Sequence, residues 1–256
     1  MKNKNIMTDV EKENSLISND RVQEFQRFID RLEGMGEYRL PQRAYHIIRL
    51  AIRDLMLPPG KAILEREMSE VLQMSRTPVR EALVRLETEG VVRLVPRRGF
   101  IVEPIEKVDL KEIYEVVETL DGLAIELATM RVGDTELDKL ESIIKNQEEE
   151  LEKRNLKGWS ILDDLFHSSI IEYAKSKRLH AVIDSYSDQS YRARLFTIKH
   201  RPIPHRSIVE HKAMVSCMRA KDGKAARMVM QSHRRRAQKE ILDALDKIDE
   251  MKRADK

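Results

Sequence analysis

The stretch ILEREMSEVLQMSRTPVREALVRLETEGVVRLVPRRGFIV, residues 63–102, decides the fold of the amino-terminal half of the chain. It predicts two short helices joined by a tight turn and followed by a β-hairpin. Thr77 is the expected N-cap of the second helix, because its hydroxyl can accept an orphan backbone N–H, and Pro78 then occupies the first helical position. Apolar residues at helical spacing predict the buried face of this helix: Val79, Ala82, Leu83 and Leu86.

The end of the same stretch predicts a basic wing. Gly90 follows the last helical turn and can adopt the left-handed cap conformation. Residues 91–95 and 100–102 predict two strands, with a turn at 96–99. Together these elements indicate a winged helix-turn-helix, whose second helix fits the major groove of DNA and can present arginine to guanine. The alternative interpretation is a small helical subdomain with a charged, solvated face.

Residues 44–102 resemble the DNA-binding domain of the GntR family of bacterial transcription regulators. The motifs that carry the resemblance are PPG at 58–60, LEREMSE at 64–70, SRTPVREAL at 75–83, LETEG at 86–90 and PRRGFIV at 96–102. The resemblance implies DNA contacts from the first short helix, the start of the recognition helix and the wing: Arg66, Ser75, Arg76, Thr77, Arg80, Arg98 and Gly99. One departure is Leu64, where many members have a serine cap, and losing a cap costs about 1 kcal/mol of stability.

Composition narrows the class of protein. The chain has 256 residues, of which 36% are charged, and a net charge of +3, so any surface for a polyanion must be local. Residues 76–98 provide such a local excess of arginine over glutamate, whereas a nonspecific nucleoid binder fits the balanced total poorly. Cys217 is the single cysteine and no run approaches membrane-spanning length, so we expect a cytoplasmic protein that does not enter a membrane.

The chain divides into three segments by pattern. Residues 1–36 form an extension, with a disordered polar start and then an added amphipathic helix that we expect to pack against the protein; a partner site is the alternative. Residues 37–104 form the winged helix-turn-helix. Residues 105–250 contain six helical patterns with short connections, which predict an antiparallel bundle that serves for effector binding and dimerisation. The expected fold class is therefore mainly α.

One set of residues in the predicted bundle has the chemistry of a metal site. Asp163 and His167 are four residues apart and share one helix face, while His211 and His233 lie on two later helices. Three imidazoles and one carboxylate suit a divalent transition metal. Spacing alone favours the simpler interpretation, in which these histidines are hydrogen-bonded or exposed.

Residues 108–245 resemble the helical effector domain of the FadR branch of the same family. The motifs are LKEIYEVVETLDGLAIELA at 110–128, DDLFHSSI at 163–170 and SIVEHKAMVSCMRAKDGKAARMVMQSH at 207–233. The resemblance implies that one metal, often zinc, nickel or manganese, is bound by Asp163, His167, His211 and His233. It further implies that a small carboxylate effector binds at open metal positions in the bundle interior.

A departure within this second resemblance concerns the effector. Many members of the branch have an arginine that helps to hold an anionic ligand at the position of Val117, and valine cannot pair with a carboxylate. Three alternatives follow: a different effector, a different mode of binding, or no effector. If an effector binds, the candidate residues are Tyr114, Tyr191, Arg192 and Arg194.

The expected function is that of a homodimeric transcription regulator, usually a repressor in this family, that binds a palindromic operator in double-stranded DNA. The effector would shift the equilibrium between DNA-binding states by its differential affinity for them. Two alternatives stay open: a regulator whose metal is purely structural, with no effector, and, remotely, a metal-dependent hydrolase. The sequence shows no general-base motif for hydrolysis, so we expect no enzyme activity.

Overall fold

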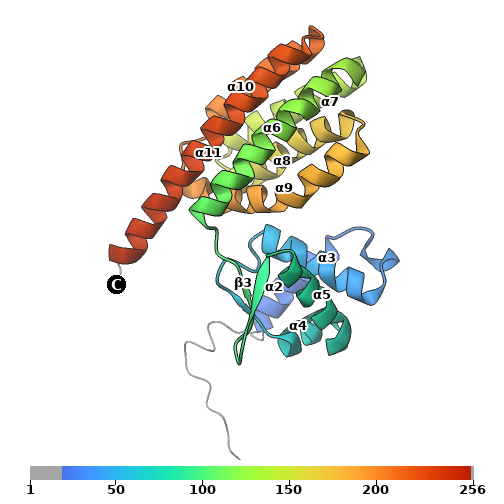
Figure 1. The fold of residues 1–256 in the computed structure, drawn as a ribbon, viewed down its shortest axis with the longest axis vertical. Helices are drawn as coiled ribbons and strands as arrows, with labels where there is room; N and C mark the ends of the chain where they lie inside the picture. Colours follow the sequence, from blue (N-terminus) through green and yellow to red (C-terminus); the bar gives the residue numbers. More distant parts are fainter. Residues whose placement is uncertain (1–18, 255–256) are drawn as a thin grey trace, which may run out of the picture. The chain divides into compact units, whose positions relative to one another are not determined.

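The computed structural model describes residues 19–254. The predicted disordered start lies outside the described residues. The chain forms two compact units that divide between Ile105 and Glu106, and each has its own hydrophobic core (Figure 1). No helix in the described range is long and apolar enough to cross a membrane.

The amino-terminal unit combines short helices with a small sheet. Its elements are α2 (Asn19–Asp30), the 3-10 turn η1 (Met35–Glu37), α3 (Leu40–Arg53), β1 (Ala62–Ile63), α4 (Glu65–Leu72), α5 (Arg76–Thr88), β2 (Val92–Val95) and β3 (Gly99–Val102). α5 packs against α3, and all four apolar residues predicted for its inner face are buried. The apolar faces of α3 and α5 thus hold the recognition helix rigidly, with its opposite face in solvent.

The added helix α2 packs onto this core. Phe25 and Ile29 are buried in it, and Val22, Phe28 and Leu32 pack against it partly buried. These residues recur at helical spacing, so one face of α2 supplies all of them. Packing is thus an observed role of this helix.

Two details of the unit differ from the sequence prediction. The predicted cap Thr77 is wrong: α5 begins at Arg76, so Ser75 is the N-cap, and it makes no side-chain capping bond. Serine and threonine are both favoured as N-cap residues, so the sequence alone could not decide which of the two begins the helix. The wing is also larger than a hairpin, because β1 pairs antiparallel with β3 and gives the strand order β1-β3-β2. A two-residue strand is too short to show an alternating pattern.

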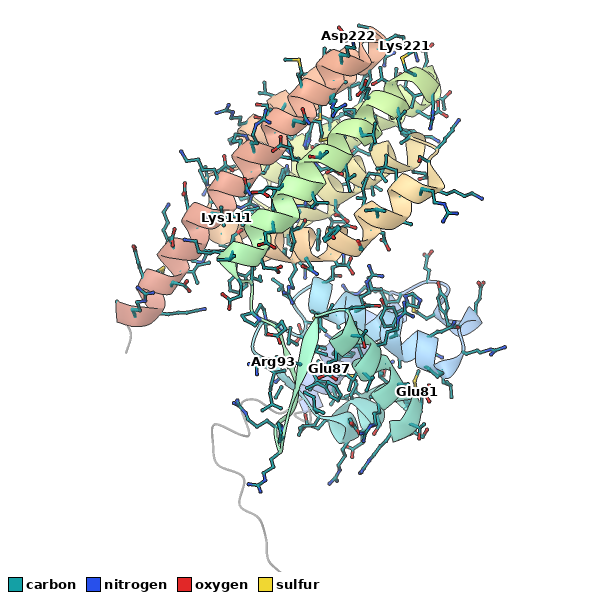
Figure 2. All side chains as sticks on the ribbon, viewed as in Figure 1. Glu81, Glu87, Arg93, Lys111, Lys221 and Asp222 are labelled. Carbon is teal, nitrogen blue, oxygen red and sulfur yellow. The ribbon has the colours of Figure 1, made fainter. Side chains whose placement is uncertain are left out.

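The carboxy-terminal unit is a bundle of six helices within the described residues. They are α6 (Lys107–Arg131), α7 (Asp134–Glu152), α8 (Leu156–Tyr173), α9 (Lys177–Thr197), α10 (His205–Arg219) and α11 (Gly223–Ala254), with the 3-10 turn η2 (Ile198–His200) after α9. In Figure 2, Lys111 near the start of α6 and Lys221 in the α10–α11 turn mark opposite ends of the bundle. The predicted mainly α fold class, with a wing and an antiparallel bundle, is confirmed.

Helix α6 occupies the centre of this bundle. It packs most extensively along α11 and also contacts α8, α9 and α10. Its buried residues therefore lie on more than one side, among them Tyr114, Val117 and Ile125. The helices around α6 carry the metal-ligand candidates: Asp163 and His167 on α8, His211 on α10 and His233 on α11.

Candidate functional site

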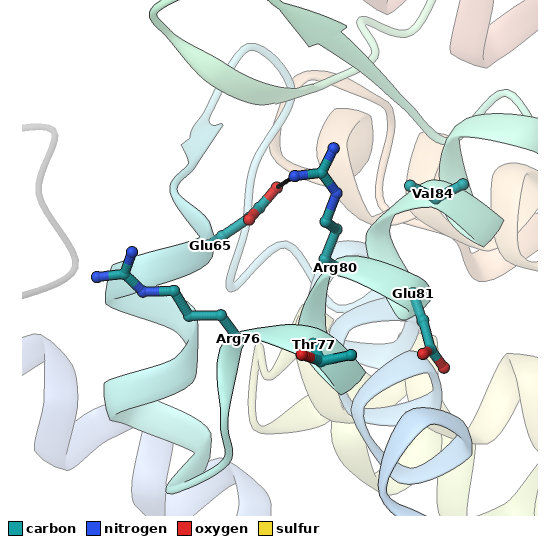
Figure 3. Close-up of a pocket in the computed structure, with 6 residues that line it drawn as sticks. All are labelled: Glu65, Arg76, Thr77, Arg80, Glu81 and Val84. Atoms are coloured by element: carbon teal, nitrogen blue, oxygen red, sulfur yellow. Dashed lines mark ion pairs between the residues drawn. The ribbon is translucent and has the colours of Figure 1, made fainter.

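The exposed face of α5 is the first candidate site. Arg76, Thr77 and Arg80 are all exposed, while Val79 and Leu83 on the opposite side of the helix are fully buried. The exposed residues line an open hollow of about 510 Å³ together with Glu65, Glu81 and Val84 (Figure 3). The start of the recognition helix therefore presents cationic side chains to solvent, where a DNA groove can reach them.

The two arginines of this face differ in their partners. Arg80 Nη1 lies 3.8 Å from Glu65 Oε1, and the Arg80 side chain is still 66% exposed. Such a loose, solvated pair contributes little energy and is easily exchanged for a phosphate or a base. Arg76 makes no ion pair with any other described residue, and Figure 3 shows it extending away from Arg80 along the edge of α4. The pair Arg80–Glu65 was not expected from the sequence.

The wing and α4 carry the other predicted contacts. Arg66 is exposed on α4 and pairs with Glu70 one turn later, at 3.0 Å. Arg98 is exposed at the tip of the wing and makes no ion pair with a described residue. In contrast, Arg93 pairs with Glu103 at 3.1 Å, and Figure 2 shows it on the strand beside Glu87. The local arginine excess is thus concentrated at the helix start and the wing tip, where it remains available to phosphate.

Gly99 has a structural reason to be glycine. Its φ is +80°, and a Cβ at this position would lie 2.7 Å from the Ile63 carbonyl oxygen and 2.9 Å from Leu64 Cδ2. β1 can therefore pack against the wing only because residue 99 lacks a side chain. A DNA contact from Gly99 would come from its backbone.

The second candidate site is a buried cluster of three histidines in the bundle. One ring nitrogen each of His167, His211 and His233 lies within 4.8 Å of the others, and all three residues are buried. Asp163 faces this cluster, with Oδ1 3.9 Å from His167 Nε2 and 3.7 Å from His211 Nε2. The structure therefore brings together all four residues that the sequence suggested as metal ligands.

Side chains behind the cluster orient two of the rings. Nδ1 of His233 lies 2.7 Å from Glu210 Oε2, and Nδ1 of His211 lies 2.9 Å from Gln147 Oε1. Gln147 in turn donates from Nε2 to the Leu162 carbonyl at 3.0 Å, which leaves its oxygen to accept. Each of these two histidines thus donates from Nδ1 and keeps the Nε2 lone pair for a ligand.

The inner nitrogens of the cluster lack hydrogen-bond partners among the described residues. This is true of both ring nitrogens of His167 and of Nε2 of His211. Leaving a buried polar atom unpaired costs about 1–3 kcal/mol, so such atoms normally have a partner, and a bound ion can be that partner here. The donor set of three imidazoles and one carboxylate, with these unpaired nitrogens turned inward, fits a divalent transition metal.

The electrostatics of the cluster favour neutral imidazoles, the form that binds metals. Burial lowers the pKa of His167 and of His211 well below the usual range, and the pKa of His233 is lowered by burial as well. Burial alone would raise the pKa of Glu210, but hydrogen bonds from His233 and Arg236 outweigh it and lower this pKa to about 2. Glu210 is therefore ionised and accepts a hydrogen bond from His233 Nδ1.

The effector candidates lie in different environments. Arg194 is committed to carboxylates, with Nε 3.4 Å from Asp163 Oδ2 and Nη2 3.1 Å from Asp164 Oδ1. Tyr191 and Arg192 are buried and already have partners. The buried hydroxyl of Tyr114, in contrast, has no hydrogen-bond partner among the described residues. Of the four candidates, Tyr114 therefore has the clearest capacity for a ligand.

Sequence reasoning missed the residues that support the cluster. Glu210 had no predicted role and Gln147 was not considered, although each fixes one histidine ring. These contacts join different helices, so no spacing within the sequence reveals them.

Comparison with known proteins bears on both sites. The family model described as "Bacterial regulatory proteins, gntR family" matches residues 40–102, and the model of the FCD domain matches residues 112–236. An uncharacterized HTH-type transcriptional regulator in the TAR-I ttuE-ttuC′ intergenic region of Agrobacterium vitis is 37% identical over 135 residues, which cover 51% of this chain and 78% of that protein. The chain belongs to the GntR family. The FCD match is consistent with the FadR branch.

Other GntR regulators agree with this membership. The HTH-type transcriptional repressor RspR of Escherichia coli K12 is 25% identical over 192 residues, 75% of this chain and 84% of that protein. The structure of E. coli McbR/YncC has the same fold, with a TM-score of 0.71 and 21% identity over 82% of this chain and 99% of that one. The chain is thus a transcription regulator of the GntR family with an effector-binding FCD domain. Its relatives are regulators, which confirms the expectation that it is not an enzyme.

Proposed function

We propose that this GntR regulator is a homodimeric repressor that binds a palindromic operator through residues 37–104. The residues that carry DNA binding in this proposal are Arg66, Ser75, Arg76, Thr77, Arg80, Arg98 and Gly99. Arginines at the helix start would read base edges, and the wing would add phosphate contacts that make binding salt-dependent. A two-fold dimer presents two such helices, and so matches a palindrome.

The helical domain, residues 105–250, would sense a small carboxylate. Asp163, His167, His211 and His233 would hold a divalent transition metal, with zinc, nickel and manganese as candidates. When bound, the metal supplies a Lewis acid that can accept a carboxylate oxygen. The chain's own residues do the rest: Glu210 and Gln147 hold the rings in place, and the closed packing around α6 excludes water from the ligand.

One observation favours this proposal over the alternative functions. The same chain has an exposed arginine face on a rigid helix and, in its other unit, a buried set of three histidines, of which His167 and His211 have ring nitrogens without partners. A purely DNA-packaging protein has no need of the second feature. A metal whose role is only structural remains the second candidate, because four protein ligands can complete a tetrahedral shell.

The test begins with selection of operator DNA from a random pool by the purified full-length protein. The affinity for that operator is then measured by fluorescence anisotropy, with zinc-loaded and chelator-treated protein, in the presence and absence of short carboxylates. The proposal predicts that a carboxylate weakens operator binding of the zinc-loaded protein and has no effect after chelation. A lower melting temperature on chelation, with no carboxylate effect in either state, would favour the structural metal instead.

A further inference from the structure

Arg201 is partly buried, and its guanidinium has one enclosed nitrogen without an acceptor. Its Nη2 donates to the backbone oxygen of Arg194 at 3.1 Å, and its buried Nε has no hydrogen-bond partner. Within residues 19–254 it forms no ion pair. Because a buried donor without an acceptor is costly, the Arg201 Nε is a candidate donor to a bound anion.

Tyr114 supplies a second unpaired donor near the same place. It is 1% exposed on α6, and its hydroxyl has no partner among the described residues. Arg201 donates to the backbone of Arg194, whose guanidinium contacts Asp163. Burial lowers the pKa of Arg201, whereas Tyr114 and Asp163 act to raise it, so both groups lie within electrostatic range of Arg201. A hydroxyl and a guanidinium that both need an acceptor define a site for a negatively charged oxygen.

Arg194 is not available to bind the anion, although its backbone oxygen lies beside Arg201. Its guanidinium is already engaged by the carboxylates of Asp163 and Asp164. Val117, buried on the same helix as Tyr114, offers no donor at all. The Arg201 Nε and the Tyr114 hydroxyl, in contrast, are two donors that a ligand can engage.

We propose that Arg201 and Tyr114 form a second anchor for the effector, separate from the histidine cluster, and that the effector is therefore a dicarboxylate. This inference rests on the proposed function, in which a first carboxylate binds at the metal. The second carboxylate accepts from Arg201 Nε and from the Tyr114 hydroxyl.

The experiment compares two series of acids on zinc-loaded, full-length protein by isothermal titration calorimetry: malonate, succinate and glutarate against acetate, propionate and butyrate. The proteins are wild type, Arg201→Met, Arg201→Lys and Tyr114→Phe. Arg178→Met, which removes an exposed arginine at the start of α9, is the matched control. Zinc content and melting temperature are measured for each variant, so that a folding defect is recognised separately.

One diacid is expected to bind wild type about tenfold or more tightly than every monoacid, because it gains charge-assisted hydrogen bonds. Arg201→Met should abolish that advantage with zinc content unchanged, Tyr114→Phe should reduce it, and Arg178→Met should retain it. If Arg201→Met does not fold, Arg201→Lys should still bind the diacid more weakly than wild type. Monoacids that bind as tightly as diacids, and still release operator DNA, would overturn the second anchor alone. No binding by any acid would overturn the proposed function as well.

Discussion

Nδ1 of His233 on α11 lies 2.7 Å from Oε2 of Glu210 on α10. Arg236 fixes the same carboxylate, with its Nε 2.8 Å from Oε1. The carboxylate cannot rotate away, so it holds the His233 ring in one tautomer, with Nε2 unprotonated. Two neighbouring helices are thus joined at a proposed metal ligand by a contact that has no local sequence pattern.

This contact predicts an effect on metal affinity. Glu210→Gln should weaken zinc binding by about 10–100-fold, because the amide holds His233 less strongly and lowers its basicity. Competition with a chromophoric chelator measures the change. Glu118→Gln, which breaks an exposed pair with Arg235 on the same helix α11, is the control and should leave zinc affinity unaltered. Equal zinc affinity in Glu210→Gln and wild type would show that His233 is not held through this carboxylate.

The metal-free bundle should lose stability as the pH falls below about 6.5. Burial lowers the pKa of His167 and His211 in the folded state, whereas histidine in the unfolded chain titrates near 6.5. In this window the unfolded state binds more protons than the folded state, so acid favours unfolding, by up to about 1.4 kcal/mol per pH unit for each histidine. Above about 6.5 these groups contribute no pH dependence.

Trp159, the single tryptophan, is buried in the bundle, and its fluorescence reports urea unfolding of this unit in chelator. His167→Gln should reduce the acid slope of the unfolding free energy relative to wild type. A slope that is unchanged by this substitution would mean that His167 is protonated equally in both states.

The backbone at Gly99 predicts a local loss of stability. Gly99→Ala should destabilise the amino-terminal unit, because it combines a φ of +80° with a Cβ that would lie 2.7 Å from a backbone oxygen. Gly90→Ala is the matched control, since Gly90 has a φ of +70° but no atom within 4 Å of the added Cβ. Backbone strain alone costs about 1 kcal/mol or more, and the clash adds to it at Gly99 only. Urea unfolding followed by circular dichroism should rank wild type, Gly90→Ala and Gly99→Ala in decreasing order; equal costs would argue against close packing of β1.

Sequence patterns predicted the parts of the fold that depend on periodicity. The inner face of α5 and the six bundle helices follow from apolar residues at helical spacing, whose burial needs no knowledge of distant contacts. The strand β1 could not be predicted in this way, because two residues are too few to show an alternating pattern. The N-cap of α5 is Ser75 and not Thr77. The sequence could not distinguish these two positions, because serine and threonine are both favoured as N-caps.

The candidate sites divide in the same way. Arg76 and Arg80 could be placed on the exposed face because Val79 and Leu83 define the buried one. His167 could be paired with Asp163 by helical spacing, but the approach of His211 and His233 is a tertiary contact. Gln147, Glu210 and Arg201 were beyond prediction because their partners lie on other elements.

The central claim is that the start of α5 reads DNA, and operator binding by Arg80→Ala tests it most directly. Removal of one base-reading arginine should weaken binding to the selected operator by about 1–3 kcal/mol, roughly 5–150-fold, and relax the preference at one base position. The circular dichroism spectrum should stay that of wild type, because Arg80 is exposed, and Arg178→Ala should bind normally. A folded Arg80→Ala protein that binds the operator with wild-type affinity and sequence preference would contradict the account.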